Sequence, residues 1–61
     1  MYNIDEVFEM AEQIERDGAD FYRKAAAHVD VEEGKTLLLE LASMEDDHEV
    51  VFAKLREKIA V

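Results

Sequence analysis

Glu45 and His48, in the second half of the chain, have the residue types and the spacing of a metal-binding pair. Residues three apart on a helix project from one face, about one turn apart along the axis. A carboxylate and an imidazole held side by side supply half of the ligands of a metal site. They form such a site only if the face that carries them points inward.

The neighbours of this pair predict that its face of the helix is buried. Steps of four and three residues trace a mostly apolar seam: Gly34, Leu38, Leu41, Glu45, His48, Phe52, Leu55 and Ile59. Three more apolar residues widen the stripe: Leu37, Met44 and Val51. Glu45 and His48 therefore stand where core residues are expected. A buried carboxylate is costly unless something compensates it. A metal cation does so, and a protonated His48 is the alternative.

The first half of the chain repeats the pattern with one carboxylate, Glu15. Its seam runs Ile4, Phe8, Ala11, Glu15, Gly18, Tyr22, Ala25 and Val29, widened by Val7, Ile14 and Phe21. A glycine inside a helix costs about 1 kcal/mol relative to alanine. We therefore expect Gly18 to allow close packing beside Glu15; the alternative is that it is only tolerated.

These patterns predict an all-α fold in which residues 1–61 form a single helical hairpin. The helices are expected at about 3–29 and about 31–59, with a turn near residue 30. In an antiparallel hairpin folded about that turn, residue i lies level with residue 60 − i. Glu15 then lies level with Glu45, so the ionisable seam residues share one layer at mid-length.

Composition excludes several classes of function. Sixteen acidic residues against seven basic ones give a net charge of −9, which opposes binding to nucleic acid or to anionic membranes. The absence of cysteine excludes disulfides and iron–sulfur clusters. No apolar run is long enough to cross a bilayer, and the first residues lack the features of a signal peptide. We therefore expect a protein that is cytoplasmic or lies inside some other cellular compartment.

The small size predicts a partner, because a two-helix hairpin cannot enclose a core by itself. The partner expected by default is a second copy, which gives a homodimer or a higher homo-oligomer. Two hairpins in a four-helix bundle offer four carboxylates and two imidazoles, which is the ligand set of di-iron carboxylate bundles. Oxygen ligands with one imidazole per metal suit iron or manganese, and zinc is possible in vitro.

The chain resembles the rubrerythrin and ferritin-like superfamily over nearly its whole length. The resemblance lies in Ile14-Glu15, Gly18, Phe21-Tyr22, Leu41-Ala42 and Glu45-x-x-His48. It is similar to the encapsulated ferritins, which are helical hairpins that build their site at a dimer interface. The resemblance implies that Glu15, Glu45 and His48 bind two iron ions per dimer, with Glu45 as a bridge and Tyr22 beside the ligands. The shell-docking C-terminal extension of the encapsulated ferritins has no counterpart before the sequence ends at Ala60-Val61. Encapsulation is therefore unsupported.

The resulting hypothesis is a di-iron oxidoreductase that oxidises ferrous iron with oxygen or peroxide. Ferroxidase, peroxidase and storage roles all stay open. Rubrerythrins that reduce peroxide usually carry a cysteine-ligated rubredoxin centre, so this chain needs an external electron donor, whose identity is unknown. Two alternatives are a non-catalytic oligomerisation module and a structural metal-binding module that holds zinc or calcium.

Overall fold

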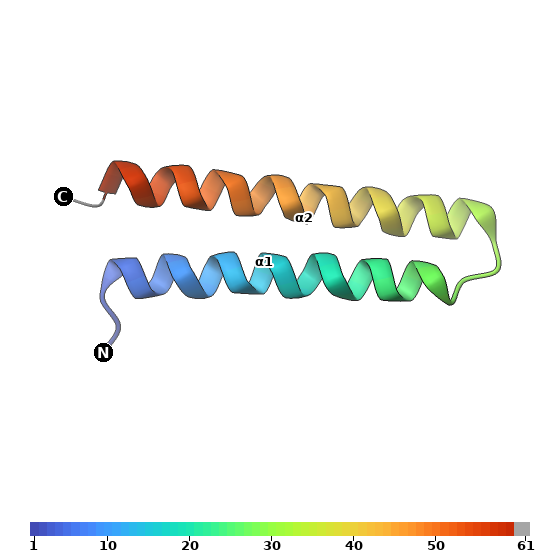
Figure 1. The fold of residues 1–61 in the computed structure, drawn as a ribbon, viewed down its shortest axis with the longest axis horizontal. Helices are drawn as coiled ribbons and strands as arrows, with labels where there is room; N and C mark the ends of the chain where they lie inside the picture. The colour runs from blue at the N-terminus through green and yellow to red at the C-terminus, as the bar shows by residue number, and fades with distance from the viewer. Residues whose placement is uncertain (60–61) are drawn as a thin grey trace.

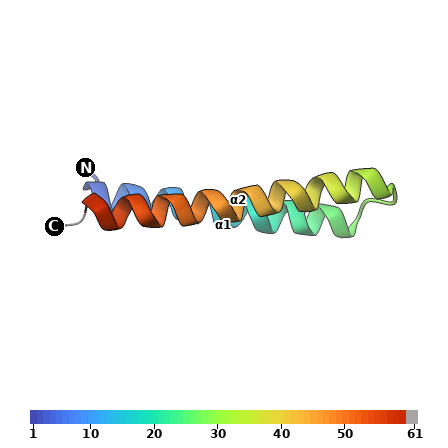
Figure 2. The ribbon, with the colours of Figure 1, turned by 90° about the horizontal axis from the view of Figure 1, so that it is seen from above.

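The computed structural model describes residues 1–59 as two antiparallel α-helices joined by a short turn (Figure 1). Helix α1 spans Ile4–Ala27 and helix α2 spans Glu32–Ile59. The helices lie side by side in one layer, 47 × 21 × 10 Å, and cross at a shallow angle (Figures 1 and 2). The predicted all-α hairpin is confirmed, whereas its pairing into a four-helix bundle stays a prediction.

Local interactions define both ends of α1. The Asn3 side chain accepts a hydrogen bond from the Glu6 amide at 2.8 Å, and the Glu6 carboxylate accepts one from the Asn3 amide at 3.3 Å. This capping box satisfies two amides that the first turn leaves without helical partners. At the other end, the His28 amide donates to the Ala25 carbonyl at 3.0 Å. That tight closure ends the helix at Ala27, two residues earlier than the sequence pattern suggested.

Small residues line the seam that joins α1 to α2. Ala19, Ala26 and Ala42 are at most 3% exposed, and their size lets the two helices approach closely. Toward the open end, the rings of Phe8 and Phe52 meet edge to face with centroids 6.2 Å apart. This pair agrees with the expected register, in which residue i lies level with residue 60 − i.

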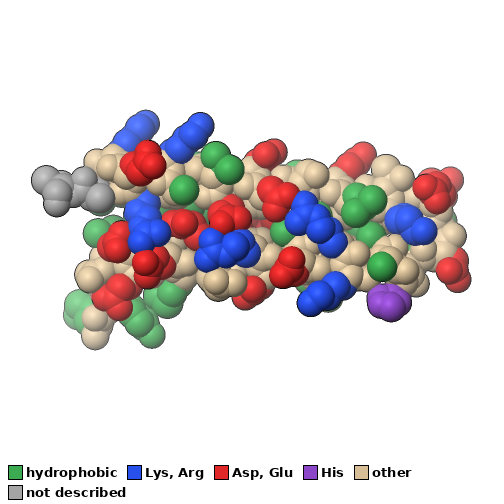
Figure 3. Space-filling view, in the orientation of Figure 1, with side chains coloured by type: hydrophobic (Ala, Val, Ile, Leu, Met, Phe, Trp, Pro, Cys, Tyr) green, Lys and Arg blue, Asp and Glu red, His purple; other side chains and the backbone are tan. Residues whose placement is uncertain are grey.

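Ion pairs close one face of the hairpin. Three arginines bridge the helices: Arg56 contacts Asp5, Glu9 and Glu12, Arg16 contacts Glu49, and Arg23 contacts Asp46. Figure 3 shows this face, with basic side chains over the junction and acidic ones beside them. Hydrogen bonds from Arg56 lower the pKa of Asp5, and those from Arg23 lower the pKa of Asp46. Five carboxylates, those of Asp5, Glu9, Glu12, Asp46 and Glu49, are therefore paired with arginines across the seam.

The opposite face of the hairpin is apolar and uncovered. Seven large side chains that are 39–67% exposed lie there: Val7, Ile14, Phe21, Leu37, Met44, Val51 and Leu55. Most of them immediately precede a seam residue, as Ile14 precedes Glu15 and Met44 precedes Glu45. The residue before a seam residue is rotated by the same angle about each helix axis. Because the two helices are antiparallel, the apolar side chains of α1 and those of α2 therefore point to the same side of the hairpin. Within residues 1–59, neither helix is long and apolar enough to cross a membrane.

Candidate metal centre

Glu15 of α1 meets Glu45 and His48 of α2 halfway along the hairpin. One possible ligand atom from each side chain lies within 4.8 Å of the other two. The His48 Nδ1 atom is 3.2 Å from Glu15 Oε2. The structure therefore brings together all three residues that the sequence pattern singled out as ligands.

The three side chains differ in burial. The Glu15 side chain is 17% exposed and Glu45 is half-buried, whereas the His48 side chain is 53% exposed. The sequence pattern had placed His48 among core residues. In the hairpin, the side of α2 that packs against α1 carries Ala42 and Glu49. Leu41 and His48, one position earlier on the helix, are therefore turned toward the uncovered apolar face.

The two carboxylates perturb one another. A hydrogen bond to Glu15 raises the pKa of Glu45, and partial burial and repulsion by the Glu15 charge raise it further. The positive charge that His48 gains on protonation acts in the opposite direction. When two carboxyl groups lie this close, the state in which they share one proton is favoured over the state in which both are ionised. A cation between them would remove that conflict, so the donor set fits a metal ion.

Gly18 lies directly against this cluster. A Cβ atom at Gly18 would lie 3.2 Å from Glu45 Oε2 and 3.3 Å from Glu45 Cδ. The sequence had suggested that Gly18 makes room beside Glu15, its neighbour one turn earlier on α1. The structure shows instead that the side chain occupying this room is Glu45, which comes from the facing helix.

Tyr22 lies one turn beyond Gly18 on α1 and is half-buried. Its ring packs edge to face against Phe21, with centroids 5.7 Å apart. Among the side-chain hydrogen bonds of residues 1–59, none joins the Tyr22 hydroxyl to the cluster. A role for Tyr22 beside the ligands therefore stays a prediction.

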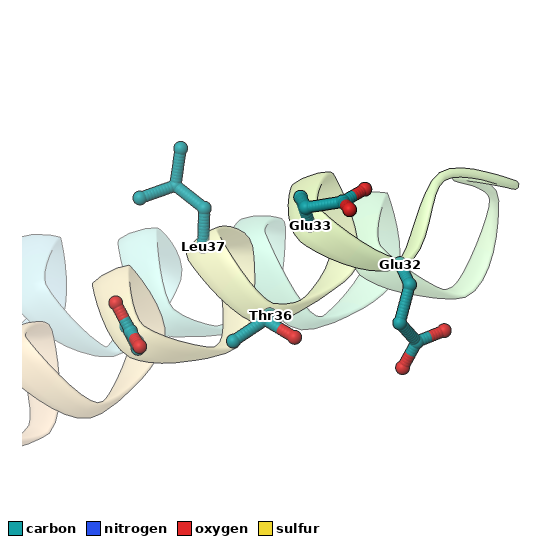
Figure 4. A pocket seen from close by; sticks show the side chains of 5 residues that line it. Glu32, Glu33, Thr36 and Leu37 are labelled. Carbon is teal, nitrogen blue, oxygen red and sulfur yellow. The ribbon is translucent and has the colours of Figure 1, made fainter.

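An open hollow of about 300 Å³ adjoins the cluster and is lined by Glu15, His48, Val51 and Phe52. It opens beside the uncovered apolar side chain of Val51. A second hollow, of about 330 Å³, lies near the turn against Glu32, Glu33, Thr36, Leu37 and Glu40 (Figure 4). Figure 4 shows its side chains pointing apart from a single helix, without convergent polar groups. Of these two hollows, the first is the one that members of the cluster line, namely Glu15 and His48.

Glu45→Gln is expected to raise the Tm of the metal-free protein at neutral pH. The folded-state pKa of Glu45 is raised, so its stabilising contribution is complete below its ordinary value of 4.5 and is lost as the pH rises through the folded-state pKa. Glutamine keeps the shape of the side chain without the charge. Thermal unfolding followed by circular dichroism should show the Tm difference shrinking as the pH falls below 4.5.

Glu40→Gln provides the matched control, since Glu40 is exposed on the same helix outside the cluster. Equal Tm shifts for the two variants at neutral pH would contradict a specific conflict between Glu15 and Glu45.

Comparison with known protein families gives one match. The family model described as Rubrerythrin matches residues 6–61, a range that contains the whole cluster. No curated protein and no solved structure matches the chain at a significant level.

Proposed function

The chain belongs to the rubrerythrin family, and from that premise we propose that it is a di-iron carboxylate protein whose site is completed by a second hairpin. The observation that carries this proposal is the convergence of Glu15, Glu45 and His48 within 4.8 Å. Carboxylate oxygens with one imidazole nitrogen suit iron and manganese better than they suit softer metals. The bound iron pair would supply the redox chemistry, in which ferrous iron gives electrons to oxygen or peroxide.

The side chains of the cluster have separate tasks in this proposal. Glu15 and Glu45 would provide negative charge that balances the metal cations, and Glu45 would serve as the ligand shared by the two ions. His48 provides the nitrogen donor and reaches the cluster from the uncovered face. Since the chain has no cysteine, electrons for peroxide reduction would come from a separate donor.

Pairing of two hairpins through the uncovered apolar face completes the proposed site. One hairpin offers two carboxylates and one imidazole, whereas two hairpins offer the set found in di-iron bundles. The residues flanking the cluster on this face include Ile14, Met44 and Val51, which are all more than half exposed. A second copy seated there would bury these side chains and enclose His48. Exposed apolar surface of this kind marks interaction sites.

A non-catalytic oligomerisation module is the second candidate function. The contact between His48 Nδ1 and Glu15 Oε2 at 3.2 Å favours it, because a protonated imidazole could balance the carboxylates without metal. In that case the layer would hold the oligomer together through hydrogen bonds alone.

The test adds ferrous iron to metal-free protein in air and follows absorbance, iron content and oligomer mass. The proposal expects uptake of about one iron per chain, since each dimer would hold two ions, with oxidation faster than in buffer alone. Tight binding without oxidation would indicate a structural metal site. An unchanged oligomer that takes up no iron would overturn the proposal in favour of the oligomerisation module.

A further inference from the structure

We propose that Gly18 is a positioning residue for the candidate metal centre, because its missing side chain leaves the space in which the Glu45 carboxylate stands. The consequence for metal binding rests on the proposed function. The spatial relation between Gly18 and Glu45 does not, and it can be tested in metal-free protein.

The atoms nearest to the space beside Gly18 belong to one side chain. The three atoms nearest to a Cβ built there are Glu45 Oε2 at 3.2 Å, Cδ at 3.3 Å and Cγ at 3.5 Å. None of these atoms belongs to the backbone of α2, so glycine is not needed here for the helices to approach. A methyl group at this position would require Glu45 to move by a few tenths of an ångström.

Nothing in the backbone requires glycine at this position. Neither glycine of the chain has a positive φ, and a glycine inside a helix destabilises it relative to alanine. The positions seven residues before and seven residues after Gly18 are both occupied by alanine, Ala11 and Ala25. Glycine therefore occurs on this stripe of α1 only where the Glu45 carboxylate faces it.

The Glu45 carboxylate cannot move aside without changing the geometry of the cluster. Ligand atoms of Glu15 and His48 lie within 4.8 Å of it, so a shift of Glu45 away from α1 changes its distances to both groups. Ligand distances at a metal ion tolerate deviations of only about 0.2 Å. A displacement of a few tenths of an ångström would consequently misplace a carboxylate whose ligand atom lies within 4.8 Å of those of both other members of the cluster.

The first experiment titrates metal-free wild type and Gly18→Ala with ferrous iron under anaerobic conditions. We expect Gly18→Ala to lower iron affinity by about 10-fold or more, comparable to the 10–100-fold losses caused by displacing groups that orient metal ligands. The Tm of the metal-free variant should be equal to or above that of the wild type, because alanine favours the helix. Wild-type iron affinity in Gly18→Ala would overturn the inference.

Ala25→Gly is the matched control, since it lies on the same stripe of α1 one heptad away. It should lower the Tm of the metal-free protein and leave iron affinity unchanged. An equal loss of iron affinity in Ala25→Gly would show that helix stability, and not the space beside Glu45, governs binding, which would also overturn the inference.

The second experiment needs no metal. Gly18→Ala is introduced into wild type and into Glu45→Ala, and the two Tm shifts are compared. Since truncation of Glu45 removes the atoms that the new methyl group would meet, we expect the larger increase in Tm in the Glu45→Ala background. Equal shifts would overturn the inference even if wild type binds iron. If the Tm shift is larger in the Glu45→Ala background while wild type takes up no iron, that result would support the spatial relation between Gly18 and Glu45 and would overturn the proposed function.

Discussion

Glu45→Ala is expected to abolish iron uptake while leaving the hairpin folded. A ligand atom of Glu45 lies within 4.8 Å of ligand atoms of both Glu15 and His48. Substitutions that only disturb the orientation of a ligand reduce metal affinity by about 10–100-fold, so loss of the ligand itself should exceed about 100-fold. The metal-free fold should survive, because neighbouring Glu15 already makes the ionised form of Glu45 unfavourable.

Asp47→Ala is the matched control for this substitution. Asp47 is exposed two residues further along α2 and lies outside the cluster, so its removal deletes the same charge without deleting a proposed ligand. Anaerobic titration with ferrous iron should show wild-type binding for Asp47→Ala and none for Glu45→Ala. If Glu45→Ala kept wild-type stoichiometry and affinity, the metal site would have to lie elsewhere.

Val51→Lys is expected to separate the proposed dimer into monomers. Val51 lies on the uncovered apolar face and lines the hollow beside His48. Burying a valine side chain contributes about 1.5–3 kcal/mol, and in a twofold-symmetric dimer each substitution acts twice. The loss of roughly 3 kcal/mol or more corresponds to at least about a 100-fold weaker association. Sedimentation should report the change in mass, and helicity and iron uptake should fall with it.

Val50→Lys distinguishes the apolar face from general surface hydrophobicity. Val50 and Val51 are adjacent and almost equally exposed, at 51% and 53%, but a rotation of about 100° along the helix turns Val50 away from the apolar face. Val50→Lys should therefore leave mass, helicity and iron uptake unchanged. If Val50→Lys dissociated the oligomer and Val51→Lys did not, the hairpins would pair through a different face.

Much of the fold and the composition of the candidate site could be predicted from the order of the residues. Heptad spacing predicts two helices, and folding the chain about residue 30 predicts that Glu15 lies level with Glu45. Both expectations agree with the structure, in which Phe8 meets Phe52 and the three ionisable residues converge. These features depend on distance along the helix axis, and each residue adds a constant rise.

Rotation of the helices about their axes was not predictable in the same way. Each helix carries two adjacent stripes, which are rows of residues at heptad spacing; one contains the buried alanines and the other contains large apolar residues. The sequence pattern joined parts of both stripes into one seam. The tertiary structure closes the hairpin on the stripe of Ala19, Ala26 and Ala42. The larger residues of the other stripe, such as Phe21, remain exposed. The signal that could have separated the stripes is the heptad series Ala42, Glu49 and Arg56, whose charged members pair across the seam.

The sequence by itself therefore determined the helices, their register and the level of the candidate metal centre, because these follow from periodicity along one chain. Only the tertiary structure decided that His48 faces outward, that Arg56 gathers three carboxylates, and that Gly18 accommodates Glu45 rather than Glu15. The physical reason is that contacts across the seam depend on the rotation of both helices. That rotation results from the balance between close packing of the alanines in the seam and pairing of charges on the face that the arginines bridge.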